Sequence, residues 1–507
     1  MAAQYDLTQT LLAYLDPHLG FPLLAHLSTT GLFDAQDLAR AQYELAKRTD
    51  MVDYTIQLFG QAHPGQQVPE EVTKRKEAVA SKGERLGHEV EKVLTVIEDP
   101  NVANALKQDK AQNLEWLQQN YNLTVEQIDA LYRYGYFRFS CGNYTEAASY
   151  LYHYRVLTPE NRLTASSLWG KLACDTLTGD WEHALEDVRT LREHIDAQRA
   201  TTSLIVSGAT DQPEAITHEA VLQRRTWLLH WCLFVFFNHP AGRVRLVELF
   251  LSPAYINTIQ TSCWWLLRYL VAALVITRRQ VSRGYVLEGS ANPLGLAGSG
   301  SSGSSKLTPS AALRELSKVI VTEAYRLRPD PIVDFFRQLY VELDFDRAQE
   351  QLAKAEAVAQ QDFFLQEHAA EFIESARFLV SEVYCRIHRN VNIADLSKRL
   401  NMSTEEGEKW IVNLICDTKT DAKIDLQEGV VRMNQQHPIV YQSVIDKTRG
   451  FTFRTSALLQ AMDRRAHPAG AAADGAGRKS SRPPSKARPA EGTGAVPPAS
   501  DEVPAEQ

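Results

Sequence analysis

The residues of this 507-residue chain that could carry out chemistry are its fourteen histidines and six cysteines. No two histidines stand two or four positions apart, so the HxH, HxxxH and HExxH patterns of zinc hydrolases are missing. The cysteines form no CxxC pair, which indicates the reduced thiols of a cytosolic or nuclear protein instead of a metal site or a disulfide scaffold. From these patterns we expect no enzyme activity, no metal and no other cofactor.

Two glycine patterns match nucleotide-binding loops in spacing alone. Gly298, Gly300 and Gly303 spell GxGxxG, but the surrounding residues are more glycine and serine. A dinucleotide site needs a strand before this motif and a helix that begins at it. Gly470 and Gly475 have the separation found in a phosphate-binding P-loop, but Ala476, and not a lysine, follows Gly475 directly. The Gly/Ser-rich stretch is therefore predicted to be a flexible insertion.

Charge and hydropathy limit the classes of partner. The net charge is −8, which argues against a dominant nucleic-acid surface. The most apolar stretch, 263–276, is interrupted by Arg268 and is too short to span a bilayer. Residues 1–10 lack the basic and apolar segments of a secretory signal. We therefore expect a cytoplasmic protein, with a nuclear pool as an alternative, and no membrane contact.

The elements that would position side chains are predicted from a repeated helix-turn-helix signature. In each copy a turn leads into an aromatic residue, with an alanine three positions further on. The copies are Gly142-Asn143-Tyr144 with Ala147, Gly179-Asp180-Trp181 with Ala184, and a partial Asp344-Phe345 with Ala348. The turn joins two antiparallel helices, the aromatic packs between them and the alanine lets them approach closely. Such units cannot bury their apolar faces alone, so they stack into a solenoid.

The segment 371–435 changes character and is predicted to be a winged helix. A helix that begins near 371 leads into a second helix over 391–400. Ser403 then caps a third helix, which carries Trp410. Residues 422–433, with a turn at Gly429, form the only convincing β-hairpin signal in the chain. Three helices followed by a hairpin are the order of elements in a winged helix.

The predicted fold is mostly α: a right-handed helical-repeat solenoid followed by a winged helix and a disordered C-terminal tail. The last helical stretch has a potential break at Gly450. The predicted regions are an N-terminal helical region at 1–120, helical repeats at 121–370 with the flexible insertion at 289–305, the winged helix at 371–435, C-terminal helices at 436–465 and the tail at 466–507.

A winged helix invites a nucleic-acid function, because related domains insert one helix into the major groove. Here the third helix would present a cluster of acids opposite Lys409 alone, which would repel phosphates. These acids are Glu405, Glu406, Glu408 and Asp417. Basic residues near the hairpin are candidates for contact with an RNA backbone, although ordinary solvated charge is the more frequent role. They are Lys419, Lys423 and Arg432.

Protein docking is the stronger hypothesis for the hairpin and the last helices. The edge of a short sheet can be extended by a strand from another chain. The last helices carry apolar residues near one face, which suits a helical bundle with neighbouring subunits. Packing back onto the winged helix is the alternative. The candidate subunit-interface residues are Ile424, Val430, Val431, Met433, Val440, Val444, Phe451, Leu458 and Met462.

Helical repeats that run into a winged helix are the layout of a PCI domain, here about 225–435. Several longer motifs make the chain similar to one PCI family, the e subunits of eukaryotic translation initiation factor three. The motifs include Phe21-Pro-Leu-Leu24, Asp50-Met-Val-Asp53, Cys141-Gly-Asn-Tyr144, Arg225-Thr-Trp-Leu-Leu-His-Trp231, Phe234-Val-Phe-Phe-Asn-His-Pro240, Trp410-Ile-Val-Asn-Leu-Ile415 and Asp421-Ala-Lys-Ile-Asp425. The insertion at 289–305 and the tail after Arg465 depart from the family pattern.

The resemblance implies a non-catalytic scaffold subunit of a multisubunit factor. That factor binds the small ribosomal subunit and promotes recruitment of messenger RNA and initiator tRNA. The implied partners are the other subunits of the factor and the small ribosomal subunit. Two alternatives stay open: a PCI scaffold of the proteasome lid or signalosome, and a stand-alone winged-helix regulator that binds RNA.

Overall fold

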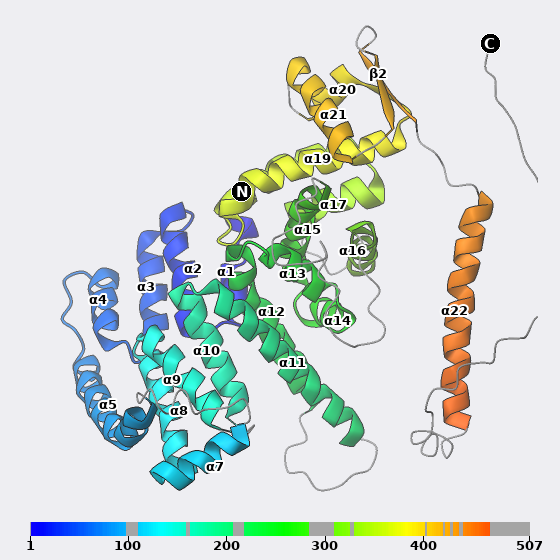
Figure 1. Ribbon diagram of the computed structural model, residues 1–507. Coiled ribbons are helices and arrows are strands. Elements are labelled where there is room, and N and C mark those ends of the chain that lie inside the picture. Colours follow the sequence, from blue (N-terminus) through cyan, green and yellow to red (C-terminus); the bar gives the residue numbers. More distant parts are fainter. Residues whose placement is uncertain are drawn as a thin grey trace, which may run out of the picture. The chain divides into compact units, whose positions relative to one another are not determined.

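The computed structural model describes residues 2–97, 110–158, 163–205, 217–282, 309–324, 329–400, 403–418, 421–425, 429–434 and 440–466 (Figure 1). The predicted insertion at 289–305 lies outside these residues. So does the predicted tail at 466–507, apart from Ala466. The chain divides into two compact units, Met1–Gln435 and Gln436–Gln507.

The N-terminal part of the first unit is helical, as predicted. Its elements are η1 (Ala2–Tyr5), α1 (Thr8–Leu12), α2 (Pro17–Thr30), α3 (Ala35–Ala46), α4 (Val52–Ala62) and α5 (Glu70–Ile97). The start of α2 follows from local sequence: the Asp16 carboxylate accepts a hydrogen bond from the backbone N–H of His18 at 2.9 Å, and Pro17 occupies the first helical position. Gly31, with φ 64°, ends the helix.

Helical hairpins continue through the middle of the unit, with neighbouring helices packed side by side (Figure 1). The first group is α7 (Lys110–Tyr121), α8 (Val125–Ser140), α9 (Tyr144–Leu157), α10 (Thr164–Thr178), α11 (Trp181–Ile205), α12 (His218–Asn238), α13 (Gly242–Phe250), α14 (Pro253–Ser262), η2 (Trp264–Leu266) and α15 (Leu267–Ser282). The second group is α16 (Pro309–Glu323), α17 (Pro331–Arg337), η3 (Gln338–Glu342), α18 (Phe345–Gln361), η4 (Gln366–His368) and α19 (Ala369–Ile387).

The three copies of the repeat signature share one turn conformation. Gly142, Gly179 and Leu343 have φ angles of 91°, 79° and 58°, all in the left-handed region. Glycine adopts this conformation freely, whereas for a leucine it costs roughly 1–2 kcal/mol. The alanines of the signature are fully buried: Ala147, Ala184 and Ala348. The helical-repeat prediction is confirmed, including its partial third copy, and the right-handed sense of the stacking stays a prediction.

The last part of the first unit has the elements of a winged helix. After α19 come β1 (Asn390–Asn392), α20 (Ile393–Arg399), α21 (Thr404–Thr418), β2 (Ala422–Asp425) and β3 (Val430–Met433). The strands form an antiparallel sheet in the order β1-β3-β2. The assignment of Val391 and Asn392 to a helix was wrong. Val391 pairs with Val431 in the sheet, and the Asn392 side chain caps α20 by accepting from the Ala394 N–H at 3.0 Å.

The N-terminal helices belong to the same core as the later repeats. One set of buried apolar side chains extends from Leu11 of α1 to Met433 of β3. The indole N–H of Trp231 donates to the carbonyl oxygen of Tyr14 at 3.1 Å, which ties α12 to the end of α1. The predicted boundary near residue 120 therefore does not mark a separate core.

A buried arginine reinforces this joining of distant segments. Arg268, 2% exposed, pairs with Asp330 at 2.6 Å and Asp362 at 3.2 Å, and donates to the carbonyl oxygen of Tyr5 at 2.6 Å. Burial would lower the pKa of Arg268, but the two carboxylates outweigh it, so that the pKa is raised. The arginine therefore stays charged and joins η1, α15 and the segments before α17 and after α18.

The second unit contains one helix, α22 (Val440–Ala466), within its described residues. C-terminal helices with a potential break at Gly450 were expected, but α22 is a single helix of 27 residues that runs through this glycine. A glycine inside a helix costs about 1 kcal/mol relative to alanine, which the rest of a long helix can offset.

Candidate interaction surfaces

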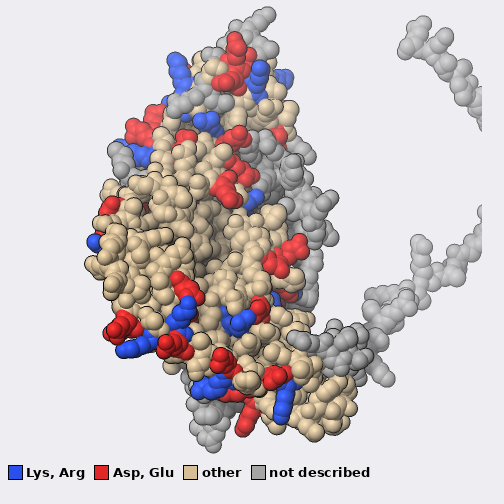
Figure 2. Space-filling model, turned by 90° about the vertical axis from the view of Figure 1, so that its left-hand side faces the viewer, with Lys and Arg blue, Asp and Glu red and all other residues tan. Residues whose placement is uncertain are grey.

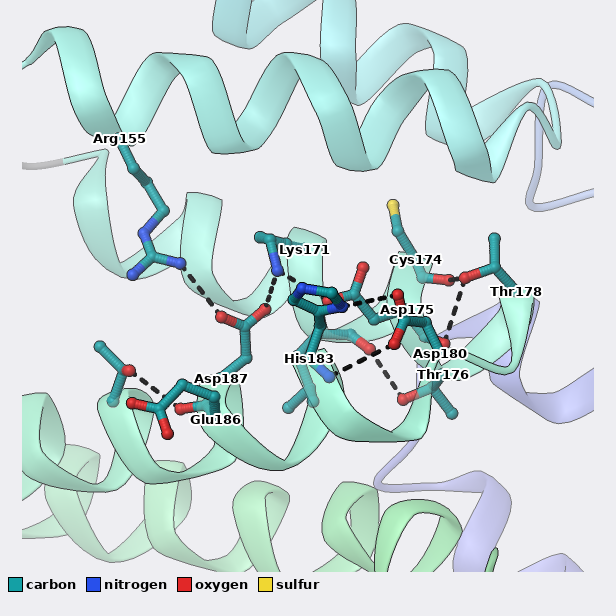
Figure 3. A network of polar contacts seen from close by, with 12 residues as sticks. Arg155, Lys171, Cys174, Asp175, Thr176, Thr178, Asp180, His183, Glu186 and Asp187 are labelled. Atoms are coloured by element: carbon teal, nitrogen blue, oxygen red, sulfur yellow. Dashed lines mark hydrogen bonds and ion pairs between the residues drawn. The ribbon is translucent and has the colours of Figure 1, made fainter. Parts of the chain in front are cut away.

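A group of paired charges joins three repeat helices (Figure 3). The ammonium group of Lys171 on α10 lies 2.7 Å from both Asp175 and Asp187, and Arg155 of α9 lies 3.2 Å from Asp187 of α11. Burial raises the pKa of Asp175 to about 6. Burial alone would lower the pKa of Lys171, but its carboxylate partners raise it. Every charge of the cluster has an opposite partner, and the ion pairs connect the three helices.

The described residues include no group of three or more His, Cys, Asp and Glu side chains that could hold a metal ion. In the same part of the chain, no single helix is long and apolar enough to cross a membrane. The bent pair of α14 and 264–278 has the composition of a broken span, but residues of α15 such as Leu270 and Val275 are buried in the core.

The sheet of the winged helix separates the predicted hairpin residues into two groups. Ile424 of β2 is 36% exposed and Val430 is half-buried. In contrast, Val431 and Met433 of β3 are only 0% and 4% exposed, because β3 is the central strand and its inward side chains complete the core. The prediction that Val431 and Met433 contact a partner was therefore wrong, and Ile424 on the edge strand stays a candidate.

The predicted RNA-contact residues are partly brought together. Lys423 and Arg432 are exposed and lie directly opposite each other on β2 and β3, while Lys419 falls outside the described residues. On α21, Glu405 and Glu408 are exposed. Hydrogen bonds from Ser403 lower the pKa of Glu406, which keeps this carboxylate ionised. The winged helix thus presents a small basic pair on the sheet and an acidic start of α21.

The five predicted residues of α22 are all exposed, between 53% and 74%. They are Val440, Val444, Phe451, Leu458 and Met462. Besides Phe453, which lies on the other side of α22, three further exposed apolar residues, Tyr441, Ile445 and Leu459, each follow a predicted residue and widen the stripe into a broad face. Sequence reasoning missed these three because it looked for a single narrow seam.

One face of the first unit carries charged side chains of both signs. Figure 2 shows basic and acidic side chains close together toward the upper and lower ends of this face, with mostly uncharged residues between them. Alternating signs of this kind do not make the continuous basic stripe that a nucleic-acid surface requires.

Comparisons with known proteins identify two regions of the chain and its family. A family model described as "eIF3 subunit 6 N terminal domain" matches residues 6–138, and a model of the PCI domain matches residues 352–435. Several similar proteins are named as e subunits of eukaryotic translation initiation factor 3. That of Mycosarcoma maydis is 57% identical over 474 residues, covering 92% of this chain and 87% of the relative. Those of Aspergillus clavatus and Aspergillus fumigatus are 43% and 42% identical, covering 90% and 91% of this chain and 93% and 94% of the relatives. The chain belongs to the family of the e subunits of eukaryotic translation initiation factor 3.

Proposed function

We propose that this chain is a non-catalytic scaffold subunit of eukaryotic translation initiation factor 3, and that it docks sister subunits through α22 and the β2 edge of the winged helix. The observation that carries the proposal is the broad exposed apolar face of α22. Apolar side chains gain most when they leave water, at roughly 25 cal/mol per Å² buried. A helix that exposes so many of them is suited to a bundle with helices of other chains.

The β2 edge supplies the second docking surface. Within the described residues, β2 is an edge strand that pairs in the sheet only with β3. Such an edge can accept a strand from another chain. Ile424 lies on this strand and is partly exposed, so an added strand would find an apolar contact there. Docking at the sheet would therefore use the β2 edge and not the buried Val431 and Met433.

On this proposal the chain works in the cytoplasm, with a nuclear pool as an alternative. It acts through the assembled factor, which binds the small ribosomal subunit and promotes recruitment of messenger RNA and initiator tRNA. The family relationship, with most of each relative's length covered, supports this assignment over a scaffold of the proteasome lid or signalosome.

Affinity purification of the tagged full chain, followed by sedimentation, tests the assignment. We expect the chain to migrate with other initiation factor subunits and with small ribosomal subunits. A stable complex with proteasome base subunits in place of these partners would overturn the proposal. An Ile424→Asp chain should recover fewer sister subunits, while Val412→Asp, at an exposed apolar position of α21 in the same winged helix, is the matched control for introducing a carboxylate.

A second candidate function is RNA backbone contact by the winged helix, favoured by the pairing of Lys423 and Arg432 across two strands. Each lost phosphate contact should reduce the slope of log affinity against log salt by about one. Filter binding of a single-stranded RNA at several salt concentrations measures this slope for the full chain and for Lys423→Ala with Arg432→Ala. An unchanged slope would show that Lys423 and Arg432 on the sheet do not contact RNA phosphates.

A further inference from the structure

The aromatic residues of the three repeat turns have different surroundings. Tyr144 is used inside the chain: its hydroxyl lies 3.0 Å from Nδ1 of His18, and its ring packs against Phe139. Phe345 packs edge-on against Tyr384, with ring centroids 5.2 Å apart. Trp181 is different, because among the described residues it has no aromatic neighbour and its indole N–H has no hydrogen-bond acceptor.

Trp181 instead lines an open groove of about 630 Å³ between two turns. One wall is the turn from α10 to α11, and the other is the turn from α12 to α13. The lining residues are Gly179, Asp180, Trp181, Glu182, His239, Pro240 and Ala241. Both turns belong to the first unit, and the groove is built from neither α22 nor the winged helix. It is therefore separate from the docking surfaces proposed above.

The groove offers hydrogen-bond donors to a ligand. Nδ1 of His239 accepts from the backbone N–H of Ala241 at 3.1 Å, so the proton of the neutral ring lies on Nε2. Burial lowers the pKa of His239, which favours this neutral form at pH 7. No atom of the described residues accepts from Nε2. Together with the indole N–H of Trp181, the groove thus has two donors suited to carbonyl oxygens.

The rim of the groove is negatively charged. Glu182 is exposed in the first turn of α11, and its charge acts on His239. Asp180 receives hydrogen bonds from His183, including one at 2.7 Å from the ring, which lower the pKa of this carboxyl (Figure 3). A carboxylate has about four lone-pair positions, so Asp180 can accept from a ligand as well. Both acids would repel the phosphates of a nucleic acid.

We propose that this groove binds an extended segment of a partner protein that carries an arginine or lysine. The cationic side chain would stack on Trp181 and pair with Asp180 and Glu182. The indole N–H and the Nε2–H of His239 would donate to backbone carbonyls of the segment, which are free in an extended or polyproline conformation. Pro240 adds an apolar wall. Charge complementarity identifies the occupant as a basic peptide.

Fluorescence anisotropy with the full chain tests the groove directly. The probes are two fluorescein-labelled peptides, Ala-Pro-Pro-Arg-Pro-Pro-Ala and the same peptide with glutamate in place of arginine. We expect the arginine peptide to bind, the glutamate peptide not to bind, and added salt to weaken binding. Asp180→Asn with Glu182→Gln should weaken binding roughly tenfold. Asparagine still caps α11, so this variant keeps the fold.

The matched control is Glu186→Gln, which removes one exposed carboxylate from the same helix outside the groove. It should bind the arginine peptide as the unmodified chain does. Trp181→Leu should lose binding, with a melting temperature that shows the variant is folded. The proposal is overturned if the two peptides bind equally or not at all, or if the groove variants bind the arginine peptide normally. It is also overturned if Glu186→Gln loses as much affinity for this peptide as the groove variants do. Displacement of the peptide by an oligouridylate RNA would also overturn it.

Discussion

The first unit and α22 differ in where their side chains find partners. In Met1–Gln435, even a deeply placed charge such as Arg268 has its carboxylate partners within the chain. In α22, large apolar residues such as Phe451 and Leu458 are more than half exposed. A sequence that satisfies its own groups specifies a self-contained fold. For α22, we propose that other chains cover its apolar face.

The contrast also appears inside the winged helix, on two facing residues. Val431 and Ile424 are partners in the β2–β3 register, yet one is fully buried and the other is at the edge. A comparison of carboxylate substitutions at these two positions therefore separates a role in folding from a role in docking.

The largest effect is expected from Val431→Asp. A carboxylate at this position would be buried without a partner, which should lower the free energy of unfolding by about 4 kcal/mol or more. Ile424→Asp should change it by less than about 1 kcal/mol, because the side chain is at the surface. Urea unfolding of both variants measures the difference. Similar losses at the two positions would mean that β2 is not an edge strand.

Arg268→Ala should have the next largest effect. The substitution leaves Asp330 and Asp362 buried without their cation, and breaking a buried pair in this way typically costs about 3–5 kcal/mol. Replacement by methionine, which fills the space, should still leave the two acids unpaired and give a loss of the same order. Loss of less than about 1 kcal/mol in urea unfolding would show that Arg268 does not hold the N-terminal segment onto the later repeats.

The Lys171 cluster should make the free energy of unfolding depend on pH. The folded chain holds the proton of Asp175 up to its raised pKa of about 6, above the ordinary value of 3.8, so the folded state binds more protons than the unfolded state between these values. The contribution of this residue to stability is therefore fully present below pH 3.8 and is lost as pH rises through 6. Relative to the unmodified chain, Asp175→Asn should gain about 1–3 kcal/mol between roughly pH 4.5 and pH 7. If the free energies of unfolding of Asp175→Asn and the unmodified chain, measured in urea, differ by the same amount at every pH, this prediction is contradicted.

The smallest effect is expected at the strained turn. Leu343 adopts a left-handed conformation that glycine adopts in the other two copies of the repeat. Leu343→Gly should stabilise the chain by about 0.5–1 kcal/mol, because strain is relieved while the unfolded state gains some entropy. A rise in the melting temperature of Leu343→Gly would confirm this stabilisation. Leu343→Ala, which retains a Cβ, is the control and should show no such rise.

Sequence reasoning reached the helical repeats because a turn, an aromatic and an alanine at fixed spacing have few structural solutions. It also found the order of the winged helix, but it missed β1, since a three-residue strand such as Asn390–Asn392 is too short to show alternation. The main error concerned which residues of the hairpin are buried. The alternation of β3 shows that its residues face opposite sides, but which side is the core depends on packing by the neighbouring helices.

The surroundings of Trp181 were equally beyond the sequence. Its signature is the same as that of Tyr144, and both were expected to pack between helices. The difference arises because the groove that Trp181 lines is completed by Pro240, on a segment far along the chain. Only the fold brings these two turns together to form the groove.

Completion of α22 by other subunits is the central claim, and one comparison tests it most directly. Tagged full chains carrying either Val444→Asp, Phe451→Asp and Leu458→Asp together, or Ala457→Asp as a control off the apolar face, are purified from cells, and the co-purifying initiation factor subunits are quantified. We expect the triple variant to lose sister subunits at least roughly tenfold, while Ala457→Asp retains them. Normal recovery of sister subunits by the triple variant would contradict the claim.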